Sequence, residues 1–124
     1  MKTQSVPKAD PGRTLAKAVF NAAALLGLKQ SEIALILGLS PATISRMAGG
    51  GYALGKGDKS WEFAALFVRM FRSLDALVGS NEAHARAWLQ SVNKAFGAAP
   101  KTLISTTEGL VRVVHYLDSA RGLN

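Results

Sequence analysis

The sequence predicts an all-α fold, and three observations support this prediction. Apolar residues recur at helical spacing from residue 13 to the end of the chain, and no segment shows the alternation of a half-buried strand. Glycines and one Ser-Pro step interrupt this pattern where helices would end and begin. The composition supports a buried core, because 48% of the 124 residues are hydrophobic and only 19% are charged.

The N-terminal part is expected to hold three short helices behind an arm. Residues 1–12 combine prolines and a glycine with polar residues, which predicts a flexible basic arm. A first amphipathic helix follows this arm and stops at Gly27, and a second stops at Gly38. Ser40 and Pro41 then start a third helix, because serine caps a helix N-terminus and proline suits the first helical position.

A glycine-rich segment, residues 49–57, is the main break in the helical pattern. The longest helix follows it and has a narrow polar stripe and a broad apolar surface. A helix this apolar needs cover on more than one side, so it is expected to act as a spine and to contribute to a dimer contact. The expected division is therefore an arm at 1–12, a first helical part at 13–58, a connecting helix at 59–79 and a second helical part at 80–124.

The second helical part is expected to hold two helices joined by an irregular stretch. The first of them starts at Asn81, and Pro100 opens a helical turn after the irregular stretch. The last helix begins at a capping box formed by Ser105 and Glu108 and ends at Gly122.

The charge balance favours a polyanionic partner. The net charge is +7, and residues 1–60 contribute five of these charges. The chain has no cysteine, which excludes disulfides and thiolate metal sites. It has no apolar run of the ~20 residues that a membrane helix needs and no signal peptide, so we expect a cytoplasmic protein without a cofactor.

The segment around residues 28–47 meets the geometric demands of a helix-turn-helix. Such a motif needs a small residue where its helices cross, which Ala34 supplies, and a turn residue that tolerates positive φ, which Gly38 supplies. Ile44 and Met47 can anchor the second helix in the core. A plain helical hairpin without a DNA role is the alternative, but it does not require these spacings together with a basic excess.

This segment, residues 28–46, resembles the Xre/Cro-type helix-turn-helix family. The resemblance implies that Gln30 contacts a phosphate and that the second helix of the motif faces the major groove. Lys29 stands where the family usually has threonine, which removes a cap and offers a phosphate contact, and Lys56 in the glycine-rich segment is a further phosphate candidate. The residues expected to contact DNA are Lys29, Gln30, Ser40, Ala42, Thr43, Ser45, Arg46 and Lys56.

A second pattern occupies residues 88–109. Asn93 is suited to a turn, and Gly109 within the last helix costs about 1 kcal/mol in helix propensity, which indicates a close approach of another segment. The pattern is similar to the C-terminal toxin-binding domain of the Xre/MbcA/ParS antitoxins, with Phe96 where leucine is common. The matching residues are Trp88, Leu89, Asn93, Phe96, Pro100, Leu103, Thr106 and Gly109. Among these, Trp88, Leu89, Phe96 and Leu103 are expected to be core rather than contact residues.

The two resemblances together imply an antitoxin: an Xre/Cro-like helix-turn-helix bundle joined by a long helix to a small helical toxin-binding domain. The implied partner is a RES-domain toxin that degrades NAD or transfers its ADP-ribose. The antitoxin would block the toxin's NAD site with its C-terminal end and bind operator DNA as a homodimer to repress their operon. The residues expected to contact the toxin are Lys101, Arg112, His115, Asp118, Arg121, Gly122, Leu123 and Asn124.

Two other functions are compatible with parts of the sequence. One is a free-standing Xre-type repressor whose C-terminal half only dimerises. The other is a nucleotide-binding enzyme, because Gly50 to Lys56 matches part of a phosphate-binding loop, although Gly57 replaces the hydroxyl residue and no strand precedes it. His84 and His115 lack companion ligands for a metal, and no catalytic constellation is evident. We therefore expect a protein that is not an enzyme.

Overall fold

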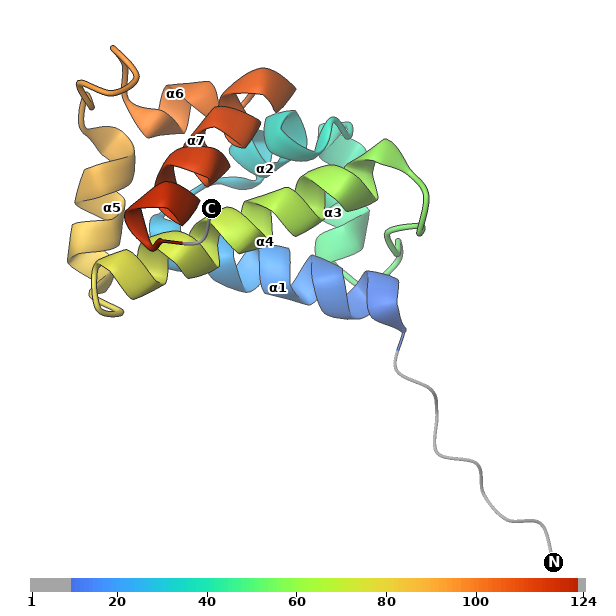
Figure 1. Ribbon diagram of the computed structural model, residues 1–124. Helices are drawn as coiled ribbons and strands as arrows, with labels where there is room; N and C mark the ends of the chain where they lie inside the picture. Colours follow the sequence, from blue (N-terminus) through green and yellow to red (C-terminus); the bar gives the residue numbers. More distant parts are fainter. Residues whose placement is uncertain (1–9, 123–124) are drawn as a thin grey trace, which may run out of the picture.

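The computed structural model describes residues 10–122, and these form a helical bundle (Figure 1). Residues 93 and 98 form an isolated bridge, and no longer strand occurs in this range. The prediction of an all-α fold is confirmed. The helices are α1 (Pro11–Leu26), α2 (Gln30–Leu37), α3 (Pro41–Ala48), α4 (Lys59–Leu77), α5 (Glu82–Gln90), α6 (Pro100–Leu103) and α7 (Thr107–Ala120).

Helix α1 begins earlier than the sequence indicated. The side chain of Asp10 accepts hydrogen bonds from the backbone N–H groups of Gly12 and Arg13, and Pro11 occupies the first turn. Residues 11 and 12 therefore belong to α1 and not to the expected arm at 1–12, whose remaining part, residues 1–9, lies outside the described residues. Leu123 and Asn124, two expected toxin contacts, lie outside them as well.

Helix α4 runs through the middle of the molecule. Figure 1 shows it between α1 and α7, and it also contacts α2 and α5. Its residues Ala64, Phe67, Met70 and Leu74 are completely buried. One continuous apolar core joins the N-terminal and C-terminal parts across this helix. The apolar surface that the sequence indicated is thus covered on more than one side.

The start of α7 differs by one residue from the expected capping box. The hydroxyl of Thr106 accepts the backbone N–H of Gly109 at 3.1 Å, so Thr106 is the N-cap. Ser105 instead donates its hydroxyl to the carbonyl of Thr102 at 2.9 Å. The predicted capping box of Ser105 and Glu108 was wrong. Ser105 and Thr106 both carry a hydroxyl, and the position of α6 decides which of the two caps α7.

Gly109 is the point of closest approach between the end of α6 and the start of α7. A Cβ atom at this position would lie 2.0 Å from the carbonyl oxygen of Leu103, a distance that no carbon side chain tolerates. The packing reason that the sequence indicated for this glycine is confirmed. Across residues 10–122, no helix is long and apolar enough to cross a membrane.

Candidate functional site

The turn between α2 and α3 has the geometry of a helix-turn-helix. Gly38 adopts the left-handed conformation with φ +67° at the end of α2, where a side chain would be strained. Ala34 is buried at 5% exposure on α2, which packs on α3, and Ile44 and Met47 hold α3 against the core. The positive φ expected at Gly38 and the core positions expected for Ile44 and Met47 are confirmed.

One exposed side of α3 carries the residues expected to enter a DNA groove, and we call it the α3 face. Ser40, Ala42, Ser45 and Arg46 are exposed on it and Thr43 is half-buried. The hydroxyl of Ser40 caps the helix by accepting the N–H of Thr43 at 3.1 Å. The guanidinium Nη2 of Arg46 donates to the hydroxyl of Thr43 at 3.1 Å. This contact orients the only long cationic side chain of α3 along the exposed side.

The candidate phosphate contacts lie around the ends of the motif. Lys29 and Gln30 are exposed at the N-terminus of α2, and Lys56 is exposed in the loop before α4. As expected, Lys29 provides no side-chain cap. Glu32 compensates in part, because its Oε1 accepts the N–H of Lys29 at 3.0 Å. The positive end of α2 and two lysines are therefore available to an anion.

Two basic residues of α1 were missed by the sequence analysis. Arg13 donates to the carbonyl of Gly50 just after α3, and Lys17 is exposed one turn further along α1. Both line a cavity of about 390 Å³ between α1 and α3, together with Met47 and Tyr52. Their four-residue spacing could have indicated a basic stripe, but only the fold shows that the stripe lies beside α3.

A cluster of aromatic rings marks the surface of the C-terminal part, and we call it the aromatic surface. It consists of Trp88 on α5, Phe96 in the following turn, and Tyr116 and Arg112 on α7. Trp88 stacks on Tyr116 with ring centroids 6.2 Å apart, and Phe96 meets Tyr116 edge-on at 5.0 Å. The Arg112 guanidinium carbon lies 5.5 Å from the centre of the Phe96 ring. Tyr116 remains 37% exposed, so the cluster still presents ring surface.

The motif residues of the second pattern fall into two groups. Leu89 and Pro100 are buried, Thr106 caps α7, and Asn93 closes a turn with its backbone N–H on the carbonyl of Ala98. These residues support the fold. The expectation of a core position holds for Leu89 at 0% exposure, whereas Trp88, Phe96 and Leu103 pack against the core and stay partly exposed.

Most of the expected toxin contacts that the structure describes lie at the surface. Arg112 and His115 are exposed on α7, and Arg121 and Gly122 are exposed at its C-terminal end. Asp118 is a correction, because it is only 3% exposed and its carboxylate binds Arg69 and the hydroxyl of Ser73. A carboxylate consumed by these internal partners offers nothing to a toxin.

Lys101 joins the two halves of the molecule. Its Nζ lies 3.1 Å from Oε2 of Glu32, so an ion pair connects α6 to the first turn of α2. Burial raises the pKa of Glu32, but the Lys29 N–H and the Lys101 ammonium lower it more, and the net pKa is below the usual value. Lys101 was expected as a toxin contact, and its half-buried position and this pair give it an internal role as well.

Two chemical alternatives gain no support from the geometry. Within residues 10–122, no group of three or more His, Asp or Glu side chains is placed to hold a metal ion. The segment from Gly50 to Lys56 is a loop between α3 and α4, without the strand that precedes a phosphate-binding loop.

Two protein families match the sequence, one over each half. The antitoxin Xre-like helix-turn-helix domain matches residues 6–69, and the antitoxin Xre/MbcA/ParS C-terminal toxin-binding domain matches residues 73–122. The chain therefore belongs to the Xre/MbcA/ParS antitoxin family. The resemblances read from residues 28–46 and 88–109 are confirmed, and the two matches meet within α4, the helix that joins the halves of the antitoxin. No curated protein sequence matches the chain.

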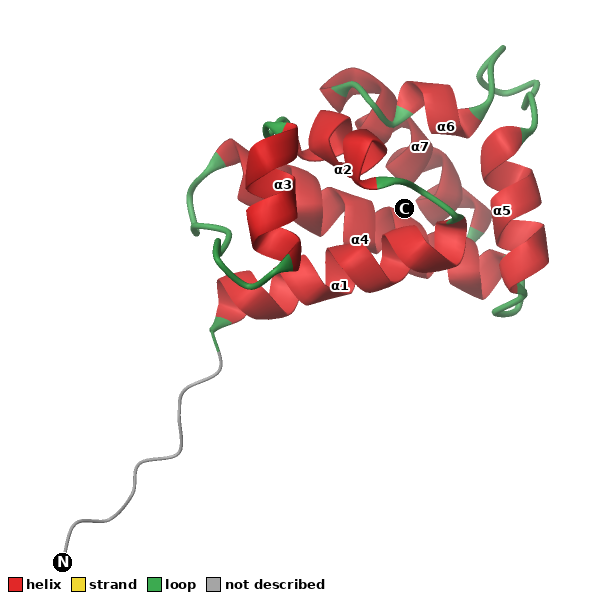
Figure 2. Ribbon diagram, turned by 180° about the vertical axis from the view of Figure 1, so that it is seen from behind, coloured by secondary structure: helices red, strands yellow, loops and turns green. Residues whose placement is uncertain are grey.

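Family membership assigns a general role to each surface. The α3 face belongs to the DNA-binding domain of the antitoxin, and the aromatic surface belongs to its toxin-binding domain. Figure 1 and Figure 2 show α3 and α5 at opposite ends of the molecule. The two surfaces therefore do not compete for the same space.

Proposed function

We propose that this antitoxin binds and inhibits a RES-type toxin that consumes NAD, and that it represses their shared operon by binding operator DNA. The observation that carries the proposal is the placement of the α3 face and the aromatic surface at opposite ends of one rigid core. Such an arrangement lets one molecule hold a toxin and DNA together. The protein acts by binding, in the cytoplasm, and needs no cofactor.

The aromatic surface supplies the anchor for the toxin. Tryptophan, tyrosine and arginine are enriched among the few residues that carry most of the binding energy of a protein interface. Trp88 stacks on Tyr116, and Arg112 lies over the ring of Phe96, which itself contacts Tyr116. His115 is exposed three residues after Arg112 on the same helix, so it extends this surface.

The C-terminal end of α7 supplies the block of the NAD site. Arg121 and Gly122 lie exposed beyond the last turn, and Leu123 and Asn124 follow them in the sequence. A guanidinium pairs strongly with carboxylates and other polar acceptors, of the kind that bind the ribose hydroxyls of a dinucleotide. Occupation of the NAD site by this end explains inhibition without any chemistry in the antitoxin itself.

Operator binding uses the α3 face in a homodimer. Two recognition helices are needed to read the two halves of a palindromic operator. Arg46 is the residue best suited to a guanine edge, and Lys29, Gln30 and Lys56 bind phosphates around it. Few long polar side chains lie on α3, so phosphate contacts and dimerisation carry much of the affinity.

Co-expression with the neighbouring reading frame tests this function. The antitoxin should form a stable complex with that product in a pull-down, and cellular NAD should fall only when the antitoxin is absent. Deletion of residues 122–124 should restore toxin activity more than it weakens the complex. A product that binds no antitoxin and leaves NAD unchanged would favour a free-standing repressor whose C-terminal half only dimerises.

A further inference from the structure

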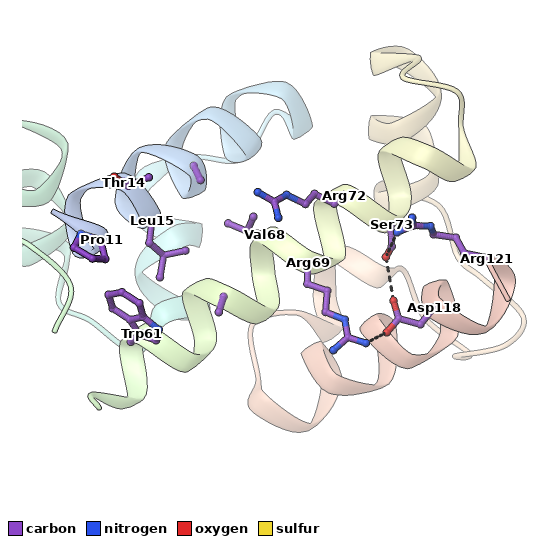
Figure 3. A pocket seen from close by; sticks show the side chains of 12 residues that line it. Pro11, Thr14, Leu15, Trp61, Val68, Arg69, Arg72, Ser73, Asp118 and Arg121 are labelled. Carbon is purple, nitrogen blue, oxygen red and sulfur yellow. Dashed lines mark hydrogen bonds and ion pairs between the residues drawn. The ribbon is translucent and has the colours of Figure 1, made fainter. Parts of the chain in front are cut away.

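A groove of about 680 Å³ is lined by residues of α1, α4 and the C-terminal end of α7. Its floor is formed by α1 and α4, and the C-terminal end of α7 closes one end of it (Figure 3). Apolar side chains line most of its length, namely Pro11, Leu15, Ala18, Trp61 and Val68. A volume of this size, mostly apolar and with polar groups gathered at one place, is typical of a site for a small ligand.

The polar groups of the groove are arginines. Arg69 and Arg121 line the end next to α7, and Arg72 extends from α4 toward α1 (Figure 3). The one carboxylate there, Asp118, is buried and accepts hydrogen bonds from Arg69 on one oxygen and from the Ser73 hydroxyl on the other. The excess of arginines over carboxylates leaves this end of the groove positively charged.

Arg121 is held at the groove by the same network. Its Nη1 donates to the hydroxyl of Ser73 at 3.0 Å, and this hydroxyl in turn donates to Asp118. The buried Asp118 thus orders Ser73, and Ser73 orders Arg121. A guanidinium ordered in this way loses less side-chain entropy when it binds an anion.

In the described part of the chain, Arg72 is the groove arginine without an ion pair or a side-chain hydrogen bond. Within residues 10–122, no ion pair or hydrogen bond involves its guanidinium, and Figure 3 shows it extended into the space between α4 and α1. Trp61, at the apolar end, lies three helical turns away on the same helix. This separation corresponds to about 16 Å at the rise of an α-helix, and apolar side chains cover the distance between the two residues.

We propose that this groove binds a free anionic amphiphile, with its carboxylate on Arg72 and its alkyl chain along Leu15 and Val68 toward Trp61. Charge complementarity selects this occupant, because the arginines need an anion and the rest of the groove needs an apolar chain. A second copy of the chain would bring another basic protein of net charge +7 against the same arginines. The homodimer proposed above then uses a different surface.

The position of the groove gives such a ligand contact with both halves of the antitoxin. It would touch α1, which packs on α3 of the DNA-binding domain, in a groove that is also lined by Arg121 of the proposed inhibitory end. Binding itself is independent of the identity of the toxin. If the groove binds no amphiphile, the proposed function is unaffected. If the antitoxin inhibits no NAD-consuming toxin, ligand binding in the groove is unaffected.

Titration of the full chain with decanoate, followed by tryptophan emission and calorimetry, tests the proposal. One saturable site per chain is expected, with weaker binding of decanol, which has the same alkyl chain and no charge. Arg72→Gln should weaken decanoate binding by about tenfold. Lys94→Gln removes an exposed charge from the turn after α5, away from the groove, and should bind as the parent does.

Three results would overturn the proposal. If Lys94→Gln weakens decanoate binding as much as Arg72→Gln does, the anion is attracted only by the net charge of the protein. If decanoate shows no saturable binding, the groove is not a ligand site. The third result would come from light scattering, which measures whether the parent and the Leu15→Gln variant are monomers or dimers. A dimer that Leu15→Gln converts to folded monomers would show that a second copy covers the groove.

Discussion

Replacement of Gly109 by alanine tests how closely the end of α6 approaches α7. Two effects oppose each other in this variant. An alanine within a helix is favoured over glycine by about 1 kcal/mol, so helix propensity alone predicts a more stable protein. The added Cβ, however, would lie 2.0 Å from the Leu103 carbonyl oxygen and 2.9 Å from the Thr106 hydroxyl.

The geometry decides which effect is larger. The atom in conflict belongs to the backbone, so it cannot swing away as the end of a long side chain would. Real Cβ contacts are longer than 3.0 Å, and the segment from Leu103 to Thr106 must therefore move by about 1 Å. Such overpacking costs up to about 3 kcal/mol, which leaves a net loss of about 2 kcal/mol.

Urea unfolding and a thermal melt measure this loss. For a chain of this size a loss of about 2 kcal/mol corresponds to a decrease in Tm of about 8 °C. His115→Ala, at an exposed position of the same helix, is the matched control and should be as stable as the parent or slightly more stable. A Gly109→Ala protein that equals or exceeds the parent would refute the account of the α6–α7 contact.

The remaining predictions concern the two surfaces and the ion pair between the halves. Arg46→Ala should weaken operator binding about tenfold or more in a gel-shift titration and leave toxin neutralisation intact; loss of both activities would argue against separate surfaces. Tyr116→Ala should weaken the toxin complex by about 2 kcal/mol or more, measured by calorimetry, and an unchanged affinity would remove the aromatic surface from the interface. Glu32→Gln breaks the pair with Lys101. Because the folded-state pKa of Glu32 is lowered, the pair stabilises the fold above the unfolded pKa and is lost as the pH falls through the folded one. Glu32→Gln should thus reduce the free energy of unfolding by less than about 1 kcal/mol at neutral pH and not at all in strong acid. If the reduction is the same at neutral pH and in strong acid, the charge of Glu32 is not its cause.

Local signals made the N-terminal half predictable. Gly38, Ser40 and Pro41 each act on the backbone within a few residues of their own position, and the structure places them as expected. Gly109 was predictable for a similar reason, because a glycine inside an apolar helix has a cost that only packing explains. The start of α7 was missed by one residue, since Ser105 and Thr106 are locally equivalent caps.

Contacts between distant parts of the chain were not predictable from the sequence. Asp118 resembles any charged residue near a helix end until α4 brings Arg69 and Ser73 beside it. The pair of Glu32 and Lys101 also depends on how α6 docks on α2. The same reasoning applies to the aromatic surface, because its rings come from α5, a turn and α7, and no local spacing relates them.

The central claim is that the antitoxin holds an NAD-consuming toxin inactive while its DNA-binding surface remains separate. The most direct measurement is the rate of NAD consumption by the purified neighbouring gene product, titrated with the antitoxin. The account predicts that NAD consumption stops at a fixed stoichiometry and that the Arg46→Ala variant inhibits equally well. NAD consumption that continues in the presence of a saturating excess of the antitoxin would contradict it.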